Sequence, residues 1–279
     1  MAPANRDTVT DNFNINLHEK SIYSQNGEDG ILEFIFSKIG TTNKFSVEFG
    51  VGNGSECNTV YLLQDKGWQG LMMNYGAINT AQPNAITRWK RSIRKFKLFC
   101  RMIRSVNFLT QNSNRPPPRL RHPIDIKTEK VTAENIQQLL KKYNTPQNFD
   151  LLSIDIDFND YWVWKSISDY SPRVVVIEFN SSIPPTESKV VRYDQNTHWD
   201  GTNYFGASLL ALKNLGLEKG YTLVGCDSNG VNAFFCRSEL VSEIKIKGIE
   251  ELYRPPRYGK IVGGVHIGHP PSKKTMIEI

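Results

Sequence analysis

Acidic and amide side chains follow two short apolar stretches in the middle of the chain. The stretch "FDLLSIDID" ends in Asp155 and Asp157, and "RVVVIEFN" ends in Glu178 and Asn180. Because side chains alternate along a strand, we expect each pair to share one face of its strand. Such oxygens could hold Mg²⁺, which lowers the pKa of a substrate hydroxyl, or one carboxylate could act alone as a general base. We assign Asp157, Glu178 and Asn180 as candidate metal ligands, and Asp155 and Asp157 as candidate catalytic residues.

A glycine-rich turn, "VEFGVGNGSECNT", is the second feature with chemical potential. Glu48, Gly50, Gly52 and Gly54 form an E-x-G-x-G-x-G pattern after an expected strand, where glycines permit a tight turn and close approach of a nucleoside. The spacing is not the G-x-G-x-x-G of a pyrophosphate-binding turn, and no Walker lysine follows. The alternative is an ordinary strand-to-helix turn, which rarely needs three alternating glycines.

His198 is the only histidine that we expect near the same edge, and it is a third catalytic candidate, with a solvated loop side chain as the alternative. Just beyond Asp157, we assign Tyr161 to the pocket and Trp164 to the core.

The four cysteines have no CxxC spacing and no histidine at zinc-ligand distance, so we expect reduced thiols.

Alternating strands and helices are expected to position these residues. The patterns predict strands at 44–50, 70–74, 124–131, 149–157 and 173–179, with helices within 23–40, 58–68, 133–143, 161–170 and 205–220, and a closing hairpin from 221–226 and 231–237. This order indicates a largely parallel sheet with helices on both faces. If 149–157 and 173–179 lie next to the first strand, the acids converge beside the glycine turn, where ligands bind in open α/β sheets.

Five motifs together resemble the FkbM-like branch of class I S-adenosylmethionine-dependent methyltransferases: "YSQNGED", "VEFGVGNGSECNT", "GWQGLMM", "FDLLSIDIDFNDYW" and "VVVIEFN". The resemblance covers roughly residues 23–82 and 124–237. It implies an α/β, Rossmann-like class I methyltransferase fold, with a seven-stranded, mostly parallel sheet and a C-terminal antiparallel hairpin. It also implies a cofactor contact at Gly50, Gly52 and Gly54, with Glu48 below the turn and Gln25 folding over it. The alternative to a metal site is that Asp155 or Glu178 caps backbone amides or contacts the ammonium group of the cofactor, so Asp155 is also a cofactor-binding candidate.

The sequence departs from this family at Asn74, where an acid usually holds the ribose hydroxyls of the cofactor. Asparagine can still donate to and accept from a hydroxyl. It forms a neutral hydrogen bond, worth about 1 kcal/mol, whereas an ionised partner contributes roughly 1.5 to 3 kcal/mol. We therefore expect cofactor binding that is weakened or lost.

The resemblance implies methyl transfer from S-adenosylmethionine to a hydroxyl of a sugar or another small polar acceptor, with or without Mg²⁺. A second hypothesis is a non-catalytic module that keeps the fold and binds a membrane, an acidic protein or RNA. A third is an RNA methyltransferase with a basic arm, with nucleic acid as the less favoured partner.

A basic segment, residues 88–122, motivates these alternatives because it carries eleven Lys and Arg and no acid. Its apolar and basic residues fall on opposite sides of a helical wheel. We expect a basic helical insertion at about 83–123, whose residues 88–104 could bind an anionic membrane or an acidic partner. The alternative is a helix that packs inward on the core.

The whole chain has 279 residues, 39% of them hydrophobic, a net charge of +6 and a mean hydropathy of −0.42. These values indicate a single core, and no apolar run has the length of a membrane span. Without a signal or transit pattern, we expect a cytoplasmic protein. We divide the chain into an N-terminal arm (1–22), a methyltransferase-like domain (23–240) and a docking tail (241–279), in which His266 and His269 lack a third metal ligand.

Overall fold

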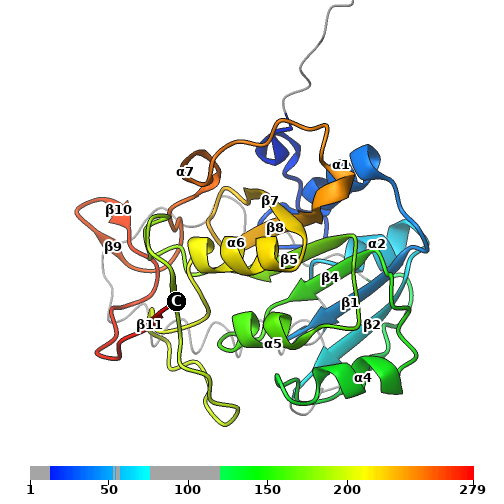
Figure 1. Ribbon diagram of the computed structural model, residues 1–279, viewed down its shortest axis with the longest axis horizontal. Coiled ribbons are helices and arrows are strands. Elements are labelled where there is room, and N and C mark those ends of the chain that lie inside the picture. The colour runs from blue at the N-terminus through cyan, green and yellow to red at the C-terminus, as the bar shows by residue number, and fades with distance from the viewer. Residues whose placement is uncertain (1–12, 53, 55–56, 76–119) are drawn as a thin grey trace, which may run out of the picture.

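The computed structural model describes residues 13–52, 54, 57–75 and 120–279 (Figure 1). Its strands and helices follow the predicted order, although several are shorter than their sequence patterns. The elements are η1 (Ile15–His18), α1 (Glu28–Ile39), β1 (Phe45–Phe49), α2 (Val60–Asp65), β2 (Gln69–Asn74), β3 (Ile126–Thr128), α4 (Ile136–Lys142), β4 (Leu151–Ile154), α5 (Asp160–Ser166), β5 (Val174–Glu178), β6 (Lys189–Val190), α6 (Leu209–Glu218), β7 (Tyr221–Cys226), β8 (Asn232–Arg237), η2 (Ser238–Leu240), α7 (Ile249–Leu252), β9 (Ile261–Val262), β10 (Val265–His266) and β11 (Ile277–Glu278).

The main sheet has the strand order β3-β2-β1-β4-β5-β8-β7. The first five strands pair in parallel, and β8 is antiparallel to both β5 and β7. The predicted α/β fold with seven strands, mostly parallel, and a closing antiparallel hairpin is therefore confirmed. β1 and β4 are neighbours at the centre, so the glycine turn after β1 and the acids after β4 lie at the same edge.

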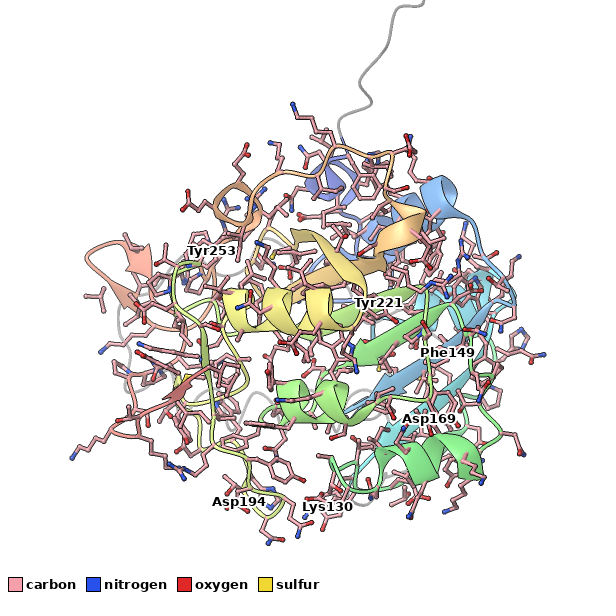
Figure 2. The ribbon with its side chains drawn as sticks, in the orientation of Figure 1. Lys130, Phe149, Asp169, Asp194, Tyr221 and Tyr253 are labelled. Atoms are coloured by element: carbon pink, nitrogen blue, oxygen red, sulfur yellow. The ribbon has the colours of Figure 1, made fainter. Side chains whose placement is uncertain are left out.

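Alternation along the strands divides the core into two layers. In β5, Val175 and Ile177 belong to the layer that contains the buried residues of α4, α5 and α6, whereas Val174 and Val176 belong to the layer that contains those of α1 and α2. Figure 1 shows α4, α5 and α6 in front of the sheet, and Figure 2 shows Phe149 and Tyr221 among the side chains of this layer. Both faces are covered, which explains the continuous apolar runs of the central strands.

Segments on both sides of the predicted methyltransferase-like domain pack against it. Before residue 23, Phe13 and Ile15 are buried against α1. The segment after 240, expected as a docking tail, contains α7, β9, β10 and β11, and β11 pairs with β6. The hydroxyl of Tyr253 donates to the carbonyl oxygen of Ser181 at 2.6 Å, which ties this segment to the loop after β5.

The basic insertion lies almost entirely outside the described residues, so its amphipathic helix and its partners stay predictions. Within the part of the chain that the structure describes, no helix combines the length and apolar character needed to cross a membrane.

Candidate functional site

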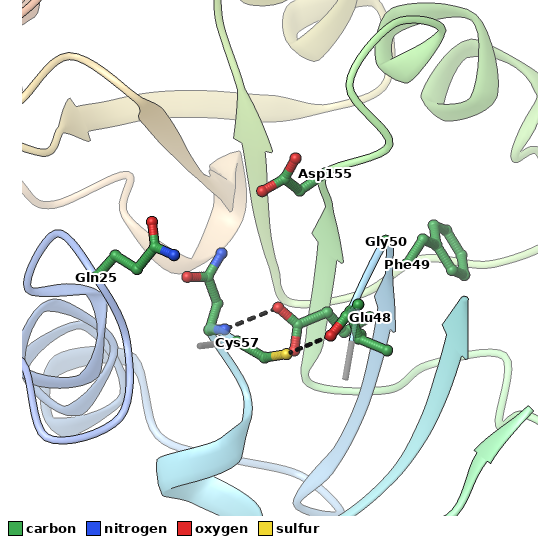
Figure 3. A pocket seen from close by; sticks show the side chains of 9 residues that line it. Gln25, Glu48, Phe49, Gly50, Cys57 and Asp155 are labelled. Carbon is green, nitrogen blue, oxygen red and sulfur yellow. Dashed lines mark hydrogen bonds between the residues drawn. The ribbon is translucent and has the colours of Figure 1, made fainter. Parts of the chain in front are cut away.

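A pocket opens at the carboxyl ends of β1 and β4, above the turn that joins β1 to α2 (Figure 3). It brings together five of the predicted site residues with four neighbours: Gln25, Glu48, Phe49, Gly50, Val51, Gly52, Cys57, Asn58 and Asp155. These nine described residues include two acids and no Lys, Arg or His. Such a lining favours a neutral or positively charged ligand over a phosphate.

Gly50 is required by the contact between β1 and β4. Its φ of 78° lies in the left-handed region, and a Cβ atom there would lie 1.5 Å from the carbonyl oxygen of Asp155. Gly52 also has a positive φ, 52°, but, its chain neighbours aside, no atom of the described residues lies within 4 Å of the Cβ position that it leaves open. The first glycine thus serves the fold, while the second leaves room beside the turn.

Glu48 fixes the turn to the start of α2. One carboxylate oxygen accepts the backbone N–H of Asn58 at 2.8 Å, and the other accepts the N–H and the hydroxyl of Thr59. The Ser153 hydroxyl adds a bond from β4 at 3.2 Å. Burial raises the pKa of Glu48, and these hydrogen bonds oppose the rise.

Asn74, the last residue of β2, holds the other side of the turn. Its Oδ1 accepts the backbone N–H of Gly52 at 3.0 Å, and its Nδ2 donates to the carbonyl oxygen of Tyr75 at 3.3 Å. Asn74 therefore supports the glycine turn directly, a role that its position in the sequence did not reveal.

Gln25 reaches the pocket from the segment before α1. The backbone N–H groups of Ile22, Tyr23 and Ser24 all donate to Oδ2 of Asp29, which bends this segment over the start of the helix. Figure 3 shows Gln25 and Asp155 extending toward the pocket from different elements, Gln25 from the α1 side and Asp155 from the end of β4.

The acids near the sheet edge form one electrostatic cluster, but not by strand alternation as predicted. β4 ends at Ile154, and Asp157 has a φ of 67°, so the two aspartates follow the strand rather than share its face. Asp160, which sequence reasoning missed, joins them from the first position of α5. Burial, reinforced by the neighbouring acids, raises the pKa of Asp155 and of Glu178 well above the ordinary range, and burial raises that of Asp160 to about 7.

Two buried oxygens of this cluster have no hydrogen-bond partner in the part of the chain that the structure describes. Asp160 accepts the N–H of Ile156 through Oδ1 at 2.8 Å, but its Oδ2 has no partner, and neither does Oε2 of Glu178. The ion pairs between described residues all lie elsewhere. The cluster is thus a concentration of acidic groups whose hydrogen-bonding capacity is only partly used.

The prediction that Asn180 binds a metal is wrong, because its amide is already committed. It is fully buried, its Nδ2 donates to the carbonyl oxygens of Asn203 and Phe205, and its Oδ1 accepts the N–H of Ser182. Asp157 and Glu178 therefore lose the third ligand proposed for Mg²⁺. Among the described residues, no three His, Cys, Asp or Glu side chains are grouped so that they could hold a metal ion.

The expectation that only His198 lies near the edge is also wrong. His198 is exposed on its loop, whereas His269, brought in by the C-terminal segment, interacts electrostatically with Asp157. The imidazole of His269 contacts the rings of Trp199, Tyr258 and Phe205 at centroid distances of 4.5, 5.2 and 5.6 Å. Burial lowers its pKa, which favours the neutral form.

The aromatic residue assigned to the pocket also lies elsewhere. Tyr161 is buried in the same core layer as Trp164, because the first turn of α5 faces the sheet. Its predicted place in the pocket is therefore wrong, while that of Trp164 in the core is confirmed.

No protein-family model and no curated protein matches the sequence. Among solved structures, the chain is similar to a SAM-dependent methyltransferase from Aquifex aeolicus (10% identity, TM-score 0.33, 78% of this chain and 93% of that one). It is also similar to an S-adenosylmethionine-dependent methyltransferase from Clostridium acetobutylicum ATCC 824 (9%, 0.34, 74% and 88%) and to the CMeT domain of the citrinin polyketide synthase (11%, 0.35, 77% and 54%). At these low TM-scores, the fold assignment rests on the strand order and pairing of the chain itself.

Substitutions at Gly50 and Gly52 should have different costs. Gly50→Ala combines left-handed strain with a clash against the Asp155 backbone, and we expect it to lower the free energy of unfolding by more than about 3 kcal/mol. Gly52→Ala meets open space, so we expect only the strain, about 1 to 2 kcal/mol. Urea unfolding measures both, and equal losses would contradict the role given to Gly50.

Replacing Asp160 with Asn should change how stability depends on pH. The folded-state pKa of about 7 exceeds the unfolded value of about 3.9, so the folded state holds an extra proton between these pH values. This group therefore makes the free energy of unfolding fall as the pH rises from about 4 to 7. Asn keeps an acceptor for the Ile156 N–H but does not titrate. The free energy of unfolding of Asp160→Asn, relative to that of the wild type, should therefore increase as the pH rises across this range.

Urea unfolding at several pH values measures this difference, and Asp169→Asn, at an exposed position shown in Figure 2, is the matched control. An offset between Asp160→Asn and the wild type that stays constant from pH 4 to 7 would refute the assignment.

Proposed function

We propose that this protein is an S-adenosylmethionine-dependent methyltransferase that methylates a hydroxyl of a sugar or another small polar acceptor. The observation that carries the proposal is the pocket at the glycine turn, whose described lining contains Glu48 and Asp155 and no cation. The sulfonium and ammonium groups of S-adenosylmethionine are positive, whereas dinucleotides and nucleoside triphosphates bring phosphates. The charge of the pocket therefore favours the sulfonium cofactor.

The residues around the turn fit the parts of this cofactor. The open space at Gly52 lets a nucleoside approach the backbone, and Asn74 stands at the end of the adjacent strand. With Oδ1 bound to Gly52, Asn74 offers Nδ2 to a ribose hydroxyl in place of its long contact with Tyr75. Asp155, on the β4 side, is placed to attract a positive group.

Methylation of a hydroxyl needs a group that accepts its proton. The cofactor supplies an electrophilic methyl group, whose bond to sulfur breaks as the bond to the acceptor oxygen forms. Asp155 and Asp157 are the carboxylates that this chain offers at the sheet edge, and the raised pKa of Asp155 makes it a stronger base than an ordinary aspartate when ionised. The proposal therefore assigns proton removal to a carboxylate alone.

Calorimetric titration with S-adenosylmethionine and S-adenosylhomocysteine tests the proposal. We expect both to bind to the full chain, with NAD⁺ and ATP as controls that do not bind because their phosphates meet the acidic lining. Binding of either control without binding of S-adenosylmethionine would overturn the assignment.

Restoring an acid at position 74 should strengthen cofactor binding. In Asn74→Asp one carboxylate oxygen can keep the Gly52 N–H while the other accepts a ribose hydroxyl as a charge-assisted hydrogen bond. A gain of about 1 kcal/mol corresponds to roughly fivefold tighter binding. Asn74→Ala, which loses the support of the turn, should bind more weakly than the wild type.

The same calorimetric titration compares the three forms. Unchanged or weaker binding by Asn74→Asp would show that this side chain does not face the cofactor.

A further inference from the structure

More acidic residues lie at the sheet edge than line the cofactor pocket. Asp155, Asp157, Asp160 and Glu178, here called the carboxyl cluster, come from the end of β4, the start of α5 and the end of β5. Only Asp155 lines the pocket. Asp160 is 0% exposed. Within the described part of the chain, neither Oδ2 of Asp160 nor Oε2 of Glu178 has a hydrogen-bond partner. Buried oxygens of this kind indicate a partner that the described residues do not supply.

The surrounding elements add little positive charge. Glu48 of β1 and Glu28 of α1 act on Asp155 as further negative groups. From the C-terminal segment, Tyr258 faces Glu178 and His269 faces Asp157. His269 is thus a base that acts on the cluster through Asp157, and burial disfavours its charged form.

Aromatic rings stand beside the acidic edge. Trp199, Phe205 and Tyr258 surround His269, which interacts with Asp157, and Trp199 is 37% exposed. Carboxylates next to aromatic rings are the combination that recognises organic cations, through charge and through cation–π attraction. A phosphorylated or carboxylated acceptor would instead disfavour the ionised form of these four carboxyl groups.

We propose that the methyl acceptor carries a positively charged amine and that the carboxyl cluster binds this amine while the acceptor hydroxyl faces the cofactor. This inference rests on the proposed function and narrows its substrate class. A protonated amine has no free electron pair, so the hydroxyl remains the nucleophile. The amine neutralises the cluster and supplies donors to the unpartnered oxygens of Asp160 and Glu178.

Matched sugars test the charge preference. Binding of glucosamine, glucose and glucose 6-phosphate to the full chain saturated with S-adenosylhomocysteine can be compared by saturation-transfer NMR near neutral pH. We expect glucosamine to bind about tenfold more tightly than glucose, and glucose 6-phosphate to bind most weakly. Ethanolamine and ethylene glycol repeat the comparison with probes small enough not to depend on sugar shape.

Variants locate the preference. Glu178→Gln and Asp160→Asn keep the size of each side chain and should reduce the preference for the amine to within about twofold. Asp194→Asn changes an exposed aspartate on the loop before α6 and should keep the full preference (Figure 2). Circular dichroism and S-adenosylhomocysteine affinity confirm that each variant is folded.

The outcomes separate the two proposals. Failure of S-adenosylhomocysteine to bind the wild type removes the proposed function and this inference with it. If it binds, but neither amine is preferred over its neutral counterpart, or glucose 6-phosphate binds best, the amine inference is overturned while the proposed function stands. The amine inference is also overturned if Glu178→Gln and Asp160→Asn both keep the full preference for the amine over its neutral counterpart.

Discussion

The close approach of β1 and β4 at their carboxyl ends is the constraint on which the site depends. At Gly50 the chain leaves β1 in a left-handed conformation, against the carbonyl oxygen of Asp155, where no side chain fits. The glycine turn and the acidic residues are therefore brought together by backbone packing. Glu48 of β1 then accepts the N–H groups of Asn58 and Thr59 at the end of the turn, and Asn74 of β2 accepts that of Gly52. The neighbouring strands β1, β2 and β4 therefore set the shape of the pocket.

Two buried acids near opposite ends of β4 show how charge distinguishes structural from functional positions. Asp150, at the amino end, accepts the N–H groups of Thr42, Asn43 and Lys44 and lies 3.6 Å from the guanidinium of Arg173. Asp160, beyond the carboxyl end, accepts the N–H of Ile156, and its Oδ2 has no hydrogen-bond partner among the described residues. The fold thus supplies the hydrogen-bond donors of Asp150, whereas Asp160 has an oxygen left for a proton or a ligand. Such an oxygen is typical of functional sites.

The C-terminal segment completes the edge of the sheet. Tyr253 bonds to the loop after β5, and β11 pairs with β6, so that Tyr258 and His269 come to lie beside Glu178 and Asp157. Asn180 contributes from the other side by binding the loop before α6. The side chain proposed as a metal ligand thus helps to build the wall of the site.

The sequence by itself determined the order of the elements, the closing hairpin and the glycine turn, because hydrophobic periodicity and glycine are local signals. It also placed Asp155 and Glu178 at one edge, since parallel neighbours end together. Only the tertiary structure decided that the Asn180 amide forms hydrogen bonds with backbone groups and that Asp160 lies among the other acids. It also decided that His269, rather than His198, interacts with Asp157. Each of these depends on contacts beyond the reach of local periodicity: a residue's pattern tells which way it faces, but not which distant segment folds against it or which hydrogen bonds it has already made.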